Sequence, residues 1–294
     1  MKIPHFYKAQ SRLGMIYLPY KGTTFNIGVE NGPDAVLSES VLKKIDSAAH
    51  VDAYTFPVLD EKDSAQYQDV LSDSTKIFRD LIESTLKDYE MQVVIGGDHS
   101  VAFPSVLSIM NRVDSKNIGY IQFDTHRDIC SFRETPSGNF HGIYLRALTD
   151  NQFDDGPVKR LVESPMSFSQ VFYVGNLDDD PMERPFLQGK TLNNITRKDI
   201  LDDKSTSIKR LSDFISKFPH IHLSFDIDVF DSTIAPATGT PSPDGLYPDD
   251  VFPLLEVFKT IPSFSMDLVE VNPEKIGAEK TVALAQRVLL AILK

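Results

Sequence analysis

Two segments of the chain carry metal-binding types of side chain at a spacing of two residues. Asp124, His126 and Asp128 follow the apolar run IGYIQF, and Asp226 and Asp228 lie in the run HLSFDID. In an extended chain, residues two apart project from the same side. Each segment therefore presents its ligand types together, although a helix cap at Asp124 and a hydrogen-bonded core histidine at His126 would give a similar pattern.

A third segment, MQVVIGGDHS, passes through Gly96 and Gly97 into Asp98 and His99. By itself this pattern is equally typical of a strand-to-helix connection with an aspartate cap. All three segments end where an apolar strand is expected to finish. In open α/β sheets the carboxyl ends of the strands form the ligand crevice, so we expect these side chains to converge.

The converging groups number too many for one tetrahedral zinc ion and contain no thiolate. Their carboxylates would repel one another strongly without cations. Two divalent ions bridged by carboxylates, with one imidazole for each ion, would relieve that repulsion, and the mixture of oxygen and nitrogen donors favours manganese. Such a pair can lower the pKa of a bridging water, which predicts metal-assisted hydrolysis. The predicted ligands are His99, Asp124, His126, Asp128, Asp226 and Asp228.

The elements that must position these ligands alternate along the chain. Short apolar runs predict buried strands at 15–20, 91–97, 118–124, 171–175, 220–228 and 263–271. Apolar residues at helical spacing predict helices at 32–45, 74–89, 206–218, 248–261 and 278–294. This alternation predicts an α/β fold with a mostly parallel central β-sheet. We find no fixed-period repeat or interdomain linker, so we expect one domain over residues 1–294. The long stretch 231–250, without a regular pattern, suggests a functional loop.

Composition limits the binding partners and the cellular compartment that we expect for the protein. The formal charge is −12, with 42 acidic and 30 basic residues and no basic stripe, so nucleic acid is not an expected partner. No apolar run approaches the ~20 residues of a membrane span. The chain has a single cysteine, Cys130, and its first residues do not resemble a signal peptide. We therefore expect a cytoplasmic protein that contacts neither membrane nor nucleic acid.

The motifs GGDHS, DTHRD and SFDIDVFD resemble the three metal-binding motifs of the ureohydrolase family, which includes arginases, agmatinases and related guanidino-group hydrolases. The segment KGTTFNIGVENGPDAV and the EVNP at 270–273 are similar to further motifs of that family, so the resemblance covers almost the whole chain. It implies a three-layer αβα sandwich, two Mn²⁺ per subunit, a small cationic guanidino substrate and a homotrimer or homohexamer.

Two loops resemble arginases more than agmatinases, namely PSGNFHG at 136–142 and APATGTP at 235–241. This resemblance implies that L-arginine is hydrolysed to L-ornithine and urea by a hydroxide that bridges the two ions. Ser137 and Asn139 would then contact the α-carboxylate, and Asp180 and Glu183 the α-amino group. The catalytic roles fall to Asp128 as acceptor of the hydroxide proton, His141 as proton shuttle or general acid and Glu270 as partner of the guanidinium.

Other assignments remain open at this stage. Cys130 stands where arginases usually have an asparagine, and Asp244 departs from the usual pattern after the Thr-Pro turn. An agmatinase, or another guanidino-acid or formimino hydrolase, is therefore the first alternative. A second is a non-catalytic arginase-like binding protein, although the ligands and the shuttle histidine are all present.

Overall fold

The computed structural model describes residues 2–15, 26–46, 49–59, 66–153, 156–175 and 177–294. Within these ranges, eight strands form one sheet in the order β2-β1-β3-β8-β7-β4-β5-β6. Every neighbouring pair is parallel. The strands are β1 (Ile3–Gln10), β2 (His50–Thr55), β3 (Glu90–Gly96), β4 (Ile118–Phe123), β5 (Val171–Val174), β6 (Asn193–Ile195), β7 (His220–Asp226) and β8 (Phe264–Val269).

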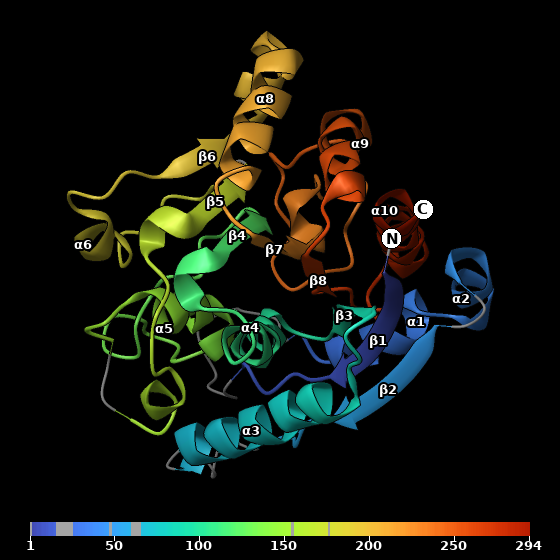
Figure 1. The fold of residues 1–294 in the computed structure, drawn as a ribbon. Helices are drawn as coiled ribbons and strands as arrows, with labels where there is room; N and C mark the ends of the chain where they lie inside the picture. The colour runs from blue at the N-terminus through green and yellow to red at the C-terminus, as the bar shows by residue number, and fades with distance from the viewer. Residues whose placement is uncertain (1, 16–25, 47–48, 60–65, 154–155, 176) are drawn as a thin grey trace.

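Helices cover both faces of this sheet (Figure 1). One face packs against α3, α4 and α5 through a core that includes Phe78 and Val106. The other packs against α8, α9 and α10 through a core that includes Leu211 and Val288. The predicted three-layer αβα sandwich is therefore confirmed. The α-helices are α1 (Gly32–Val36), α2 (Glu39–Ile45), α3 (Tyr67–Thr85), α4 (Ala102–Met110), α5 (Tyr144–Thr149), α6 (Arg184–Leu187), α7 (Arg197–Asp202), α8 (Lys204–Ile215), α9 (Pro248–Leu255) and α10 (Ala278–Leu293).

The central strands are the ones that the apolar runs predict. β3, β4, β5, β7 and β8 are buried at every residue, as expected for parallel strands with helices on both faces. The edge strands carry a weaker signal: β2 is exposed or half-buried throughout, and β6 has three residues. β1 contains Pro4, His5 and Lys8 within a buried strand, so its sequence lacks a plain apolar run. Of the strand predicted at 15–20, all but Met15 lies outside the described residues.

Two predicted helices are interrupted. Residues 32–45 form two helices, because Leu37 (ψ 62°) and the extended Ser38 (ψ 159°) break the helical path between α1 and α2. Residues 248–261 form α9 followed by the 3-10 helix Glu256–Thr260. Helix α4 was not predicted: eight of its nine residues are buried, so it lacks the polar face that gives an amphipathic helix its period.

All the strands run in the same direction, so their carboxyl ends lie along one edge of the sheet. β3, β4, β7 and β8 occupy neighbouring central positions, and their ends lead directly into Asp98, Asp124, Asp228 and Glu270. The fold thus brings the predicted motifs together at one place. Among the described helices, none combines the length and apolar character needed to cross a lipid bilayer.

Candidate metal centre

His99 lies at the centre of one group of carboxylates. Its Nδ1 is 3.2 Å from Asp124 Oδ2, 2.9 Å from Asp128 Oδ2 and 3.2 Å from Asp226 Oδ2. His99 is 2% exposed and Asp124 is fully buried, so these groups meet in the interior. Ligand atoms of His99, Asp124 and Asp226 all lie within 4.8 Å of one another, which is close enough to share one metal ion.

His126 lies at the centre of a second group. Its Nδ1 is 3.3 Å from Asp124 Oδ1 and 3.1 Å from Asp228 Oδ2. The two carboxylate oxygens of Asp124 therefore face different histidines, Oδ2 towards His99 and Oδ1 towards His126. Ligand atoms of Asp124, His126 and Asp228 again lie within 4.8 Å of one another. Asp124 is shared between the groups, as a bridging ligand would be.

The chemistry of these groups fits a metal. The Nδ1 atom of His99 is buried and has no hydrogen-bond partner among the described residues, even though three carboxylate oxygens surround it. A buried polar atom without a partner is costly unless something else satisfies it. Burial raises the pKa of Asp226 well above its usual range, and the neighbouring charges of Asp228 and Asp124 raise it further. A divalent cation would satisfy the imidazole and offset that repulsion.

The loop after β3 positions His99 through a close backbone approach. A Cβ at Gly97 would lie 1.9 Å from the carbonyl oxygen of Ser11, so only glycine fits there. Asp98 is fully buried, and its carboxylate accepts hydrogen bonds from the Ser11 hydroxyl (3.0 Å), the Gly14 N–H (3.2 Å) and the Ser100 N–H (2.9 Å). Asp98 therefore fixes this loop and belongs to neither metal-binding group.

Two residues of the site have backbone conformations that are rare for side chains with a Cβ. Asp128 has φ 56° and Glu270 has φ 65°. Such left-handed conformations cost on the order of 1–3 kcal/mol each and persist where the surroundings enforce them. Here the Glu270 carboxylate accepts hydrogen bonds from the His99 N–H (2.8 Å) and from Asn26 Nδ2 (2.6 Å). The strain places both carboxylates at the centre of the site.

A buried line of polar side chains along β7 and β8 supports His99 from behind. The Nε2 atom of His99 is 2.8 Å from the hydroxyl oxygen of Ser224, and the Ser224 hydroxyl donates a hydrogen bond to Asp267. Because Ser224 donates to Asp267, its oxygen accepts from His99 Nε2–H, which leaves Nδ1 as the metal-facing lone pair. His222 Nε2 bonds Asp267 from the other side at 2.8 Å, and Ser265 links His222 to His220.

Gln122 supports the carboxylates directly. Its Nε2 donates to Asp124 Oδ2 at 2.7 Å, and Tyr144 donates to its Oε1 at 3.2 Å. Gln122, Ser224, Asp267 and the other residues of the polar line were not predicted from the sequence. One signal was available: polar residues alternate within the buried runs HIHLS and SFSMD, which is unusual for strands covered on both faces.

A cavity of about 190 Å³ opens above the metal-binding groups. Its lining includes every predicted ligand except Asp124, which lies beneath the surface, and all six of the predicted residues Ser137, Asn139, His141, Asp180, Glu183 and Glu270. Gly239 and Thr240, from the predicted functional loop 231–250, also line it. The fold therefore brings all of the predicted site residues into a single site.

Glu270 and His141 lie next to each other in the wall of this cavity. His141 Nδ1 is 3.8 Å from Glu270 Oε1, and Glu270 is 5% exposed. Burial by itself would lower the pKa of His141, but the Glu270 carboxylate raises it above its ordinary value. Burial likewise would raise the pKa of Glu270, but His141 and the His99 N–H hold it below its ordinary value. The pair therefore favours a protonated imidazole beside an ionised carboxylate.

The outer wall of the cavity is acidic around Cys130. The Cys130 thiol points to Asp180 Oδ2 at 3.7 Å. The buried Glu183 accepts hydrogen bonds from the Ile129 N–H (3.3 Å) and from Arg127 Nη1 (3.1 Å). Burial raises the pKa of Glu183 to about 7. Arg127 lines the cavity but is held by Glu183 and by the carbonyl of Asp178, and the sequence analysis did not single it out.

The chain is similar in sequence to known proteins. A family model described as the arginase family matches residues 11–294. An arginase from Staphylococcus aureus (strain MRSA252) is 31% identical over 284 residues, which cover 88% of this chain and 90% of that protein. The human protein named arginase-2, mitochondrial, is 28% identical over 291 residues, covering 93% and 81% of the two chains.

The fold is similar to that of Entamoeba histolytica arginase in complex with L-ornithine, with a TM-score of 0.86 and 22% identity over 100% of this chain and 99% of that one. This structural likeness supports the fold, and the family assignment rests on the sequence matches. With the match to residues 11–294 and the 31% identity to a bacterial arginase, the chain belongs to the arginase family and is a ureohydrolase.

Proposed function

We propose that the protein hydrolyses L-arginine to L-ornithine and urea. The observation that carries the proposal is the position of Asp124, whose two oxygens serve two adjoining histidine–aspartate groups beneath a cavity lined by Glu270 and His141. The membership of the arginase family supports hydrolysis of a guanidino group, and the loop residues Ser137 and Asn139 support an amino-acid substrate.

The proposed cofactor is two Mn²⁺ per subunit. His99, Asp128 and Asp226 would belong to one ion and His126 and Asp228 to the other, with Asp124 shared between them. Mixed carboxylate and imidazole donors suit manganese. When bound, such a pair of ions supplies a hydroxide nucleophile at neutral pH by lowering the pKa of a water.

Glu270 is proposed to bind the guanidinium of the substrate. A guanidinium is planar and presents several N–H donors, which match a carboxylate. The carboxylate of Glu270 is held ionised by its hydrogen bonds, and it lines the cavity. Asp128 lies 2.9 Å from His99 and also lines the cavity, so its carboxylate can accept the proton released as the nucleophile attacks.

His141 is proposed to protonate the departing amine. Collapse of the tetrahedral intermediate releases ornithine only if the leaving nitrogen gains a proton. Glu270 raises the pKa of His141, so the imidazole keeps a proton to donate at higher pH than an ordinary histidine would. It lies at the cavity wall with its ring 3.8 Å from Glu270, on the same side as the proposed guanidinium site.

The amino-acid end of arginine would lie toward the cavity mouth. Ser137 and Asn139 are proposed to bind its α-carboxylate, and Asp180 and Glu183 its α-amino group. Cys130 weakens the first of these interactions, because a thiol is a poor hydrogen-bond donor and this one already points to Asp180. This observation favours a second candidate substrate, agmatine, which is a guanidinium compound without the carboxylate.

Urea release from a panel of guanidines tests the proposal. We would load the protein with Mn²⁺ and compare kcat/KM for L-arginine, agmatine and 4-guanidinobutyrate. A preference for arginine supports the first proposal, and a preference for agmatine would transfer the assignment to an agmatinase. Absence of urea from every substrate, with two equivalents of Mn²⁺ bound, would transfer the assignment to a formimino hydrolase or to a binding protein with the ureohydrolase fold.

A further inference from the structure

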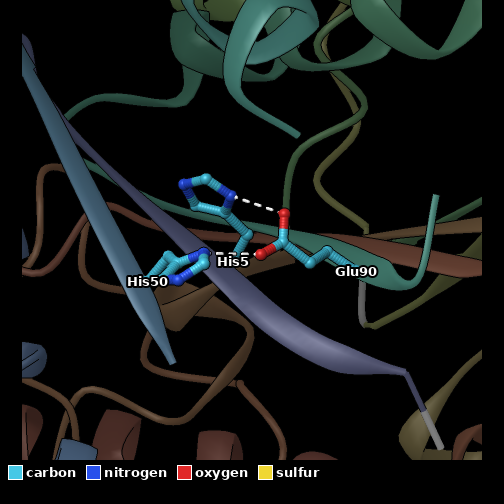
Figure 2. Close-up of side chains that lie close together, drawn as sticks. All are labelled: His5, His50 and Glu90. Atoms are coloured by element: carbon cyan, nitrogen blue, oxygen red, sulfur yellow. Dashed lines mark hydrogen bonds and ion pairs between the residues drawn. The ribbon is translucent and has the colours of Figure 1, made fainter. Parts of the chain in front are cut away.

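A second cluster of histidine and carboxylate groups lies on β1, β2 and β3 (Figure 2). Glu90 Oε2 is 2.9 Å from His5 Nδ1, and Glu90 Oε1 is 2.6 Å from His50 Nδ1. Ligand atoms of these three residues all lie within 4.8 Å of one another. The ligand atoms in each of the two groups at the metal centre are equally close together. None of the proposed catalytic residues contributes to this cluster.

Strand pairing builds the cluster. His5 is paired with His50 in the register of β1 and β2, and Ile3 is paired with Glu90 in the register of β1 and β3. Glu90 is the first residue of β3 and Gly96 its last, so the cluster and the loop before His99 are separated by about 20 Å at ~3.3 Å per residue. The cluster is therefore a separate site at the amino ends of the strands.

A further carboxylate orients one of the imidazoles. Asp52 Oδ2 is 2.8 Å from His5 Nε2. If Nε2–H of a neutral His5 donates to Asp52, its Nδ1 presents a lone pair towards Glu90. A lone pair facing a carboxylate oxygen at 2.9 Å needs a cation or a proton between them. A carboxylate behind the imidazole is also the usual arrangement at histidines that bind metals.

The surroundings of the Glu90 carboxylate favour its ionised form. Glu90 is 3% exposed, and its Oε2 also accepts a hydrogen bond from the Lys87 N–H at 2.8 Å. Burial by itself would raise the pKa of Glu90, but the hydrogen bond from the Lys87 N–H and the two imidazoles beside the carboxylate hold it below its ordinary value. His50 has 59% of its side chain exposed, so a ligand that bridges the three residues can still reach solvent.

We propose that His5, His50 and Glu90 bind a divalent cation of the zinc class through both Nδ1 atoms and the carboxylate. Two imidazoles and one carboxylate are a donor set that suits zinc, and the exposed side of His50 leaves a fourth position for water. β2 is an exposed edge strand, and its first residue is His50. The cation would join the start of this edge strand to the starts of β1 and β3.

Titration of the Mn²⁺-saturated full-length chain with Zn²⁺ tests this site. Isothermal titration calorimetry and metal analysis after dialysis against excess Mn²⁺ would count the zinc ions retained. We expect one Zn²⁺ that Mn²⁺ does not displace, and at least a tenfold loss of that affinity in His50→Ala. The exposed neighbour Asp88→Asn is the matched control and should bind zinc as the unmodified chain does.

Two further variants separate the possible outcomes. Glu90→Gln should also lose the zinc, and if it fails to fold, His50→Ala decides, because His50 lies at the surface of an edge strand. Asp124→Asn, at the other end of the sheet, should keep the zinc even when urea production is lost. An unmodified chain that retains no zinc, or a His50→Ala variant that retains it equally well, would overturn the proposal and leave a proton-bridged cluster.

Discussion

The two ends of the sheet hold clusters of the same residue types that are built in different ways. At the amino ends, His5, His50 and Glu90 are strand residues, and strand register alone brings them together. At the carboxyl ends, the ligands lie mainly beyond the strands, and Asp128 and Glu270 have strained backbones. Register places ligands against one another, whereas loops and strain are needed to direct them into a cavity that a substrate can enter.

Both clusters orient an imidazole through its second nitrogen. Asp52 bonds His5 directly at 2.8 Å, whereas Asp267 acts on His99 through the hydroxyl of Ser224. Asp124 and Glu90 each face two histidines, but Asp124 also joins two groups that contain a further aspartate each, Asp226 and Asp228. Each of these features of the carboxyl-end cluster can be altered by a single substitution.

Removal of the shared carboxylate should have the largest effect. In Asp124→Asn, both metal-binding groups lose a charged ligand, so we expect urea production to fall by ~1,000-fold or more, a loss of about 4 kcal/mol in transition-state stabilisation. The measurement is kcat/KM with Mn²⁺ supplied, together with bound Mn²⁺ per chain. Asp88→Asn is the exposed control. A variant that kept two Mn²⁺ and a tenth of the activity would contradict the bridging role.

Loss of the proposed proton donor should have the next largest effect. His141→Ala should lower kcat by ~100-fold or more, within the usual range for a general acid, and should leave bound Mn²⁺ unchanged because His141 lies outside both metal-binding groups. Added imidazole should restore part of the activity. Loss of Mn²⁺ together with activity would show instead that His141 supports the metal centre.

Removal of the Ser224 hydroxyl, which links His99 to Asp267, should weaken metal binding. Ser224→Ala removes the link between His99 and Asp267, so we expect the Mn²⁺ affinity to fall by ~10–100-fold, as for other outer partners of metal-binding histidines. Ser263→Ala is a matched control, because Ser263 bonds His220 at the far end of the same polar line. Equal affinities for the two variants would mean that Ser224 does not orient His99.

Replacement of the cysteine at the cavity wall should change substrate preference modestly. Cys130→Asn supplies an amide donor where the thiol is a poor one, so we expect kcat/KM for arginine to rise relative to agmatine by ~10-fold. The Mn²⁺ content should not change. A fall in the arginine-to-agmatine ratio would place the carboxylate of the substrate elsewhere.

The sequence predicted the centre of the fold better than its edges. The strands β3, β4, β5, β7 and β8 carry continuous apolar runs because helices cover both of their faces. β2 and β6 are not buried along their whole length, so they have no continuous apolar run, and α4 has no polar face. Their sequences therefore lack the periodic signal on which such predictions depend.

The site was also predicted only in part, because the sequence revealed its closely spaced ligands but not the residues that support them. Residues two apart on a strand end could be recognised, so Asp124, His126 and Asp128 were found together. Asp267 could not, because a polar residue inside a buried strand does not reveal that its partner, Ser224, lies on another strand. The cluster at His5, His50 and Glu90 is hidden for the same reason, since its members are far apart in the sequence.

The pairing of β7 with β8 has a consequence for how the protein folds. Ser224 is paired with Asp267, and Asp226 follows on the same face of β7. A slip of one residue between these strands would turn His222, Ser224 and Asp226 to the opposite face together. A misaligned sheet would therefore lose a metal ligand and the support of His99 at the same time, so only chains with the correct alignment could be stabilised by the metal during refolding.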